Sequence, residues 1–130
     1  MTPATRQWLK TLAFVRKFIF VALHRVRTKK MRELLVQGHH IDERNTIDGV
    51  RHGFILIHKH PECPPGVAAA TLIHEFGHFL LRKQEHKEND AWDAGRQGIP
   101  ESLIPSEFDA QKKRCLEAYR LWGLHAGVRE

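Results

Sequence analysis

The chain has 130 residues, of which 42% are hydrophobic and 28% charged, enough for one globular domain with its own core. Its two cysteines, Cys63 and Cys115, stand in unrelated contexts, which excludes a disulfide framework and a zinc knuckle built from CxxC pairs. Arg16 and Lys17 interrupt the longest apolar stretch, so we expect neither a membrane-spanning helix nor a secretory signal. We predict a single domain over residues 1–130, located in the cytoplasm.

The net charge of +6 comes from the first quarter of the chain. Nine of the 21 Lys and Arg residues precede Glu33 and no acidic residue does, which leaves 12 basic against 15 acidic residues in the remainder. A basic segment of this kind is typical of contact with nucleic acid or with an anionic membrane surface, and of organellar transit peptides.

The same quarter has the apolar spacing of a helix, which we predict at about residues 5–27. Apolar residues recur there every three or four positions: Trp8, Leu12, Val15, Ile19, Leu23 and Val26. The simplest interpretation of this basic amphipathic helix is that one face packs on the domain core while the other faces water. Contact with nucleic acid or an anionic surface is the alternative.

The remaining elements follow from periodicity and turn residues. A short helical or extended segment at 31–36 precedes a turn-rich stretch at 39–52 and a strand, GFILIH, at 53–58. Helices are predicted at 67–81, near 88–97, and from Ser106 as N-cap to Gly123. The fold class is therefore α+β, with helices predominating and a small sheet beside the helix at 67–81.

That helix contains the stretch LIHEFGH, residues 72–78, with two histidines four positions apart and a glutamate after the first. At this chain's own residue frequencies, HExxH is expected roughly 0.06 times by chance. The helix is otherwise almost wholly apolar, so it should be buried, and burying these polar groups without partners would cost several kcal/mol. A divalent cation would satisfy them; a cluster of hydrogen bonds with other core groups is the alternative.

The spacing suits a catalytic zinc site. His74 and His78 lie one above the other on a helix and can bind one ion, while Glu75 lies about 100° round and can reach a zinc-bound water without binding the metal. Glu75 would act as the general base in hydrolysis of a peptide bond. Gly77, which is costly inside a helix, indicates that another backbone passes close by.

A catalytic zinc site needs a third protein ligand, and Glu88 is the favoured residue. It shares a helix face with Trp92 and with the small residues Ala91 and Gly95, which would let a neighbouring helix approach. Three alternatives lie nearby: His86, Asp90 and Asp93. A continuous helix would separate Glu88 from His78 by about 15 Å, so the chain must reverse within residues 82–87.

One part of the chain resembles a known family of proteins. The order of GFILI, a short proline-containing loop, an apolar helix with HEFGH, and Glu-x-x-Ala in the next helix resembles the ImmA/IrrE family of zincin-type metallopeptidases over residues 50–95. The resemblance implies zinc held by His74, His78 and Glu88, with Glu75 as general base. It also implies a protein substrate such as a DNA-binding repressor, and a strand at 54–58 to which an extended substrate would add.

Other zinc patterns fit less of the chain. The longer HExxHxxGxxH signature would need glycine and histidine where the chain has Leu81 and Gln84. SprT-like zincins also begin with HExxH and stay an alternative. A peptide deformylase would need a ligand cysteine in an EGCLS-type loop, which PECPPG does not match. Cys63, eleven residues before His74, nevertheless stays an alternative residue that could approach the metal.

These observations predict a zinc-dependent metallopeptidase acting on a protein or peptide, with zinc bound by His74, His78 and Glu88. The alternative, from a different class, is a noncatalytic zinc-stabilised module whose basic N-terminal helix binds nucleic acid or an anionic surface. The sequence leaves the oligomeric state open.

Overall fold

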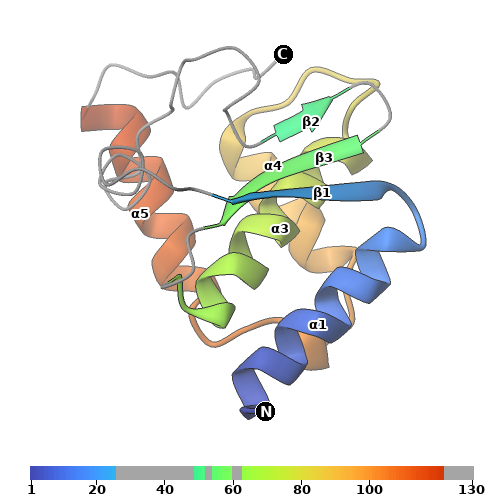
Figure 1. Ribbon diagram of the computed structural model, residues 1–130. Helices are drawn as coiled ribbons and strands as arrows, with labels where there is room; N and C mark the ends of the chain where they lie inside the picture. Colours follow the sequence, from blue (N-terminus) through green and yellow to red (C-terminus); the bar gives the residue numbers. More distant parts are fainter. Residues whose placement is uncertain (26–48, 52–53, 60–62, 122–130) are drawn as a thin grey trace.

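A computed structural model describes residues 1–25, 49–51, 54–59 and 63–121 of the chain (Figure 1). The segment predicted at 31–36 and most of the turn-rich stretch lie outside these residues. The elements are, in chain order, α1 (Pro3–Arg16), β1 (Phe20–Arg25), β2 (Gly49–Arg51), β3 (Phe54–Lys59), α3 (Pro65–Leu80), α4 (Glu88–Gln97), the short 3₁₀ helix η1 (Glu101–Leu103) and α5 (Phe108–Leu121). Helices predominate over a small sheet, which confirms the predicted α+β class.

The three strands form one sheet in the order β1-β3-β2. β1 runs parallel to β3, with Phe20 opposite Phe54 and Arg25 opposite Lys59, and β2 pairs with β3 in the antiparallel sense. The predicted strand is therefore present as β3, but it is the central strand. Since β1 covers one edge along its full length and β2 covers the other at Phe54–Leu56, the prediction that a substrate adds to this strand is wrong for Phe54–Leu56.

Helix α3 lies at the centre of the fold and contacts α1, α4, α5, β2 and β3 (Figure 1). Its sequence explains this position, because an apolar surface all round must be buried on every side. Its residues from Ala68 to Ala70 and from Leu72 to His78 are buried, together with Gly66.

Within the described part of the chain, no helix is both long and apolar enough to cross a membrane.

Helix α1 packs against α3 through one face. Trp8, Leu12 and Val15 on that face are buried, while Arg6 and Lys10 on the opposite face are exposed. The prediction that a basic amphipathic helix contributes to the core is confirmed for residues 3–16.

The predicted helix at 5–27 is wrong for residues 17–25, because the chain turns after Arg16 and enters β1. Exposure alternates there with a period of two: Phe18 is 57% exposed, Ile19 7%, Phe20 65% and Val21 0%. This is the pattern of a strand with one buried face, in a segment of aromatic and β-branched residues that favour strands. Pairing with β3 overrides the helical spacing that Ile19 and Leu23 share.

Helix α5 begins one residue later than predicted, at Phe108, so that Glu107 and not Ser106 precedes its first residue. The hydroxyl of Ser106 donates to the Glu107 carboxylate at 2.9 Å and does not cap the helix. The first helical hydrogen bond runs from Gln111 N to the carbonyl of Glu107. The predicted end at Gly123 lies outside the described residues.

Helices α3 and α4 pack with their backbones in close contact, as Gly77 and Gly95 predicted. A Cβ atom on Gly77 would lie 1.7 Å from the carbonyl oxygen of Ala91, and one on Gly95 would lie 2.1 Å from that of Ile73. No side chain larger than hydrogen fits at either position. The chain reverses between Leu81 and Lys87, as predicted, so the start of α4 comes beside the second half of α3.

We expect Gly77→Ala to lower the free energy of unfolding by about 3 kcal/mol or more, because its methyl group would displace the backbone of α4. Gly66→Ala is the matched control in the same helix, since the three atoms nearest to its Cβ would all belong to the end of the Glu107 side chain, which can move. Urea unfolding of both variants measures the difference. Equal stability of the two variants would contradict the close contact.

We expect Trp8→Ala to destabilise the protein by about 3–5 kcal/mol, because it removes a large buried side chain between α1 and α3. The adjacent Leu9→Ala removes an exposed side chain and should change stability by less than about 0.5 kcal/mol. Chemical denaturation checks both values. If Trp8→Ala were as stable as the parent, α1 would not be part of the core.

Candidate metal centre

The polar residues of the HEFGH motif lie in the protein interior, where α3 meets the start of α4. His74 is 4% exposed, Glu75 2% and His78 5%, and Glu88 of α4 is completely buried. Two carboxylates and two imidazoles thus share an environment in which isolated charge is costly. Such a group requires either mutual hydrogen bonds or a cation.

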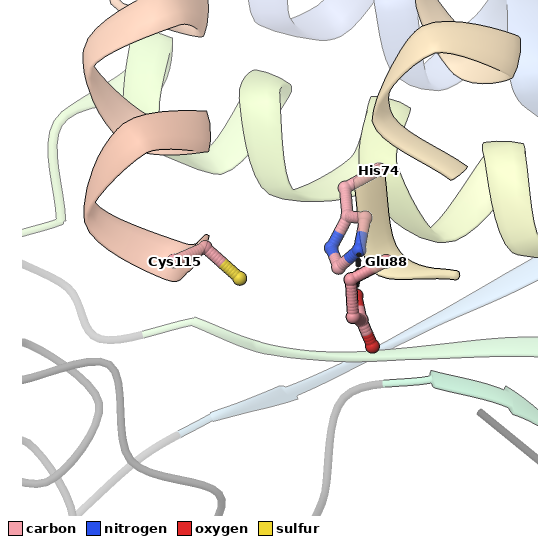
Figure 2. Close-up of side chains that lie close together, drawn as sticks. All are labelled: His74, Glu88 and Cys115. Atoms are coloured by element: carbon pink, nitrogen blue, oxygen red, sulfur yellow. Dashed lines mark hydrogen bonds and ion pairs between the residues drawn. The ribbon is translucent and has the colours of Figure 1, made fainter. Parts of the chain in front are cut away.

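Three side-chain atoms converge on one point. Nε2 of His74 lies 2.6 Å from Oε2 of Glu88, Nε2 of His78 lies 3.1 Å from the same oxygen, and the two nitrogens are 3.1 Å apart. The three predicted metal ligands are therefore brought together. The 2.6 Å contact between His74 and Glu88 is drawn in Figure 2.

The spacing of these atoms fits a metal ion. Tetrahedral zinc bound at about 2.0–2.1 Å places its ligand atoms about 3.3 Å apart. The observed separations of 2.6–3.1 Å are shorter, and they place the three atoms at hydrogen-bonding distance from one another. Two imidazole nitrogens and one carboxylate oxygen also form a donor set that suits zinc.

Glu88 reaches this position because it is the first residue of α4 and points inward with Ala91, Trp92 and Gly95, all of them buried. A favourable interaction with the helix dipole would not require complete burial, since that effect also operates at the surface. The amide of Lys87 is instead capped by Asp90, whose Oδ2 accepts its hydrogen bond at 3.0 Å. Helix capping therefore does not explain why Glu88 is buried.

The alternative third ligands lie elsewhere. Asp90 and Asp93 are exposed, and Asp93 pairs with Lys112 at 2.9 Å. His86 is buried, but its Nε2 lies 2.7 Å from Nδ1 of His78, the ring nitrogen that does not face Glu88. It therefore contacts the cluster from outside the triangle of ligand atoms.

The ring of His74 is held by Trp92. The two rings stack with centroids 4.3 Å apart and planes only 5° from parallel, and the indole in turn packs edge-on against Phe108. Because a stacked ring cannot rotate freely, this contact restricts where Nε2 of His74 points. The sequence placed Trp92 on the inward face but did not reveal its contact with His74.

Glu75 lies beside the edge of the His74 ring that faces away from Glu88. Its Oε2 is 3.5 Å from Nδ1 of His74, the nitrogen that does not contact Glu88. The carboxylate is buried beside the cluster and is not one of the three converging atoms. This agrees with the expected separation between the ligands and the glutamate of the motif.

The structure brings Cys115 close to the cluster, which the sequence did not predict. Its sulfur and ligand atoms of His74 and Glu88 all lie within 4.8 Å of one another, and Figure 2 shows the thiol directed from α5 toward the His74 ring. In the sequence Cys115 stands seven residues after Phe108, which puts both on one face of α5. Cys63, which the sequence left as an alternative, packs partly buried against the core at the start of α3.

Comparison of the chain with protein families, with curated proteins and with solved structures gave no match in any of the three cases.

We expect the purified chain to bind about one zinc ion, and Glu88→Ala to weaken that binding at least about tenfold by removing one of three ligands. Asp93→Ala is the matched control, because it removes a neighbouring carboxylate of α4 that is exposed. Mass spectrometry of metal content and chelator competition measure both, with circular dichroism to verify folding. Equal weakening in the two variants would contradict the assignment of Glu88.

Proposed function

We propose that this chain is a zinc-dependent metallopeptidase that hydrolyses a peptide bond in a protein or peptide substrate. The supporting observation is the convergence of His74, His78 and Glu88 within 3.1 Å of one another, with the buried carboxylate of Glu75 on the same helix. A set of three protein ligands is characteristic of catalytic zinc sites, which keep one position open, whereas structural sites have four.

In this proposal the four residues have two separate roles. His74, His78 and Glu88 hold the zinc ion, which when bound supplies a Lewis acid that polarises the scissile carbonyl and makes water more acidic. Glu75 accepts a proton from the attacking water as its oxygen bonds to the carbonyl carbon. It then delivers that proton to the amine nitrogen as the carbon–nitrogen bond breaks.

The environment of Glu75 suits this role. Its carboxylate is 2% exposed and is anchored next to the first ligand histidine, so bulk water does not compete strongly for its lone pairs. A base held in a poorly solvated site interacts more strongly with a nearby proton than a surface carboxylate does.

The substrate class is proposed from the resemblance to ImmA/IrrE-type peptidases. It implies a regulatory protein, such as a DNA-binding repressor. A cytoplasmic location is proposed from the cysteine content, which indicates no disulfide framework. Because β1 and β2 cover β3 at Phe54–Leu56, an extended substrate would have to lie elsewhere than along this part of the strand.

The second candidate is a noncatalytic zinc-stabilised module that binds nucleic acid or an anionic surface through α1. It is favoured by the exposed face of that helix, where Arg6, Lys10 and Arg16 stand without an acidic residue anywhere in Pro3–Arg16. We favour the enzyme because a site that only stabilises the fold has no use for the carboxylate of Glu75 beside three ligands.

We expect Glu75→Gln to retain about one zinc per chain while lowering peptide hydrolysis by at least about a hundredfold, because the amide cannot accept the proton. The matched control is Glu85→Gln, the same substitution at an exposed position in the α3–α4 connection. Zinc-loaded proteins are incubated with a proteome-derived peptide library, and new peptide termini are identified by mass spectrometry. If Glu75→Gln generates the same termini at the parent rate, the enzymatic proposal fails.

A further inference from the structure

His86 connects the candidate metal centre to the backbone between α3 and α4. On one side its Nε2 lies 2.7 Å from Nδ1 of His78, and on the other its Nδ1 lies 2.9 Å from the carbonyl oxygen of Gln84. The ring is 9% exposed. A chain of two hydrogen bonds thus runs from the main chain to the second histidine of the motif.

The direction of these hydrogen bonds follows from the carbonyl group, which can only accept. Nδ1 of His86 must therefore carry a hydrogen and donate it to Gln84. In the neutral ring, Nε2 of His86 then has a lone pair and accepts, so Nδ1 of His78 is the donor. Neutral His78 consequently has its own lone pair on Nε2.

That lone pair faces the other ligand atoms. Nε2 of His78 is the nitrogen that lies 3.1 Å from both Nε2 of His74 and Oε2 of Glu88. A metal ion binds an imidazole nitrogen only through a lone pair, and the hydrogen bond made by the other ring nitrogen determines which tautomer is present. The carboxylate of Glu88 favours a hydrogen on this Nε2, but it lies 3.1 Å away and its closer partner is Nε2 of His74 at 2.6 Å, whereas His86 lies 2.7 Å from Nδ1 of His78. The closer contact with His86 therefore favours the tautomer of His78 that can bind a metal.

We propose that His86 is a positioning residue, which holds His78 in the Nδ1–H tautomer with Nε2 directed at the metal position. The inference rests on the proposed function in that His78 is taken as a zinc ligand. His86 itself does not contact the metal in this arrangement, which distinguishes it from the alternative third ligand considered from the sequence.

The acceptor of this chain of hydrogen bonds is fixed by its own backbone. The amide of Gln84 donates to the carbonyl of Leu81 at 3.0 Å, and the amide of Leu81 donates to that of Gly77 at 3.1 Å. The Gln84 carbonyl is thereby tied to the last turn of α3, the helix that carries His78. His74 has a different neighbour at its own Nδ1, the Glu75 carboxylate at 3.5 Å.

Two substitutions separate the effect of the hydrogen bond between His86 and His78 from the effect of the space that the His86 ring fills. His86→Gln places an amide oxygen near the position of Nε2 and can still accept from His78, whereas His86→Phe fills similar space and cannot accept. Loss of such an outer partner typically weakens metal binding about 10–100-fold. We expect that weakening for His86→Phe, and zinc affinity within about threefold of the parent for His86→Gln.

The tautomer is measured directly, on the metal-free parent and variants at mildly alkaline pH, by ¹⁵N NMR of the histidine rings, with His78 assigned by substitution. We expect the Nδ1–H form of His78 in the parent and in His86→Gln, and a shift toward the Nε2–H form in His86→Phe. Zinc affinity is determined in parallel by chelator competition, after circular dichroism has shown that each variant is folded.

The outcomes separate this inference from the proposed function. An Nε2–H tautomer of His78 in the metal-free parent would overturn the role of His86, as would equal zinc affinity of the parent and His86→Phe. A parent that binds no zinc would overturn the proposed function, while the tautomers would still decide whether His86 orients His78. If both variants fail to fold, the parent spectrum alone decides that point.

Discussion

The close contact between the backbones of α3 and α4 is the constraint on which the candidate site depends. At Gly77 a methyl group would lie 1.7 Å from the Ala91 carbonyl oxygen, so the two helices can approach this closely only without a side chain there. The same approach brings Glu88, one turn before Ala91, against the two histidines of α3. A wider separation would leave Glu88 buried beyond hydrogen-bonding reach of them, which is energetically unfavourable.

The location of the cluster on the central helix lowers the free energy of unfolding. Most of the other residues of α3 contribute apolar surface to the core, whereas His74, Glu75 and His78 introduce groups that lose their hydration on burial. The contacts with Glu88 and His86 compensate part of this cost within the metal-free chain. A ligand that binds only the folded arrangement would stabilise it further, so we expect metal binding and folding to be coupled.

In the N-terminal quarter, residues of similar composition and spacing form both a helix, α1, and a strand, β1. Its basic residues are compatible with a surface helix, and α1 does bury only one face, through Trp8, Leu12 and Val15. The apolar residues after Arg16 have helical spacing too, yet they form the strand β1 beside β3. The decisive difference is the availability of a partner strand, which is a property of the fold and not of the local sequence.

The sequence by itself determined what depends on neighbours along the chain. The apolar character of residues 67–81 implied a buried helix, the spacing of His74 and His78 put both on one face, and the small residues Gly77 and Gly95 implied a close helix contact. It also favoured Glu88 by its place on the inward face of α4. Each of these properties follows from helix periodicity, which is local.

Only the tertiary structure decided which faces meet. It showed that Trp92 stacks on His74, that His86 contacts the far side of His78, that Cys115 of α5 lies near the cluster, and that β3 is central with β1 as its partner. Residues 14 or more positions apart in the chain, such as His74 and Glu88, come together through the packing of whole elements. Periodicity specifies the face that a residue occupies but not the element that covers it, because many sequences with the same pattern can pack in different ways.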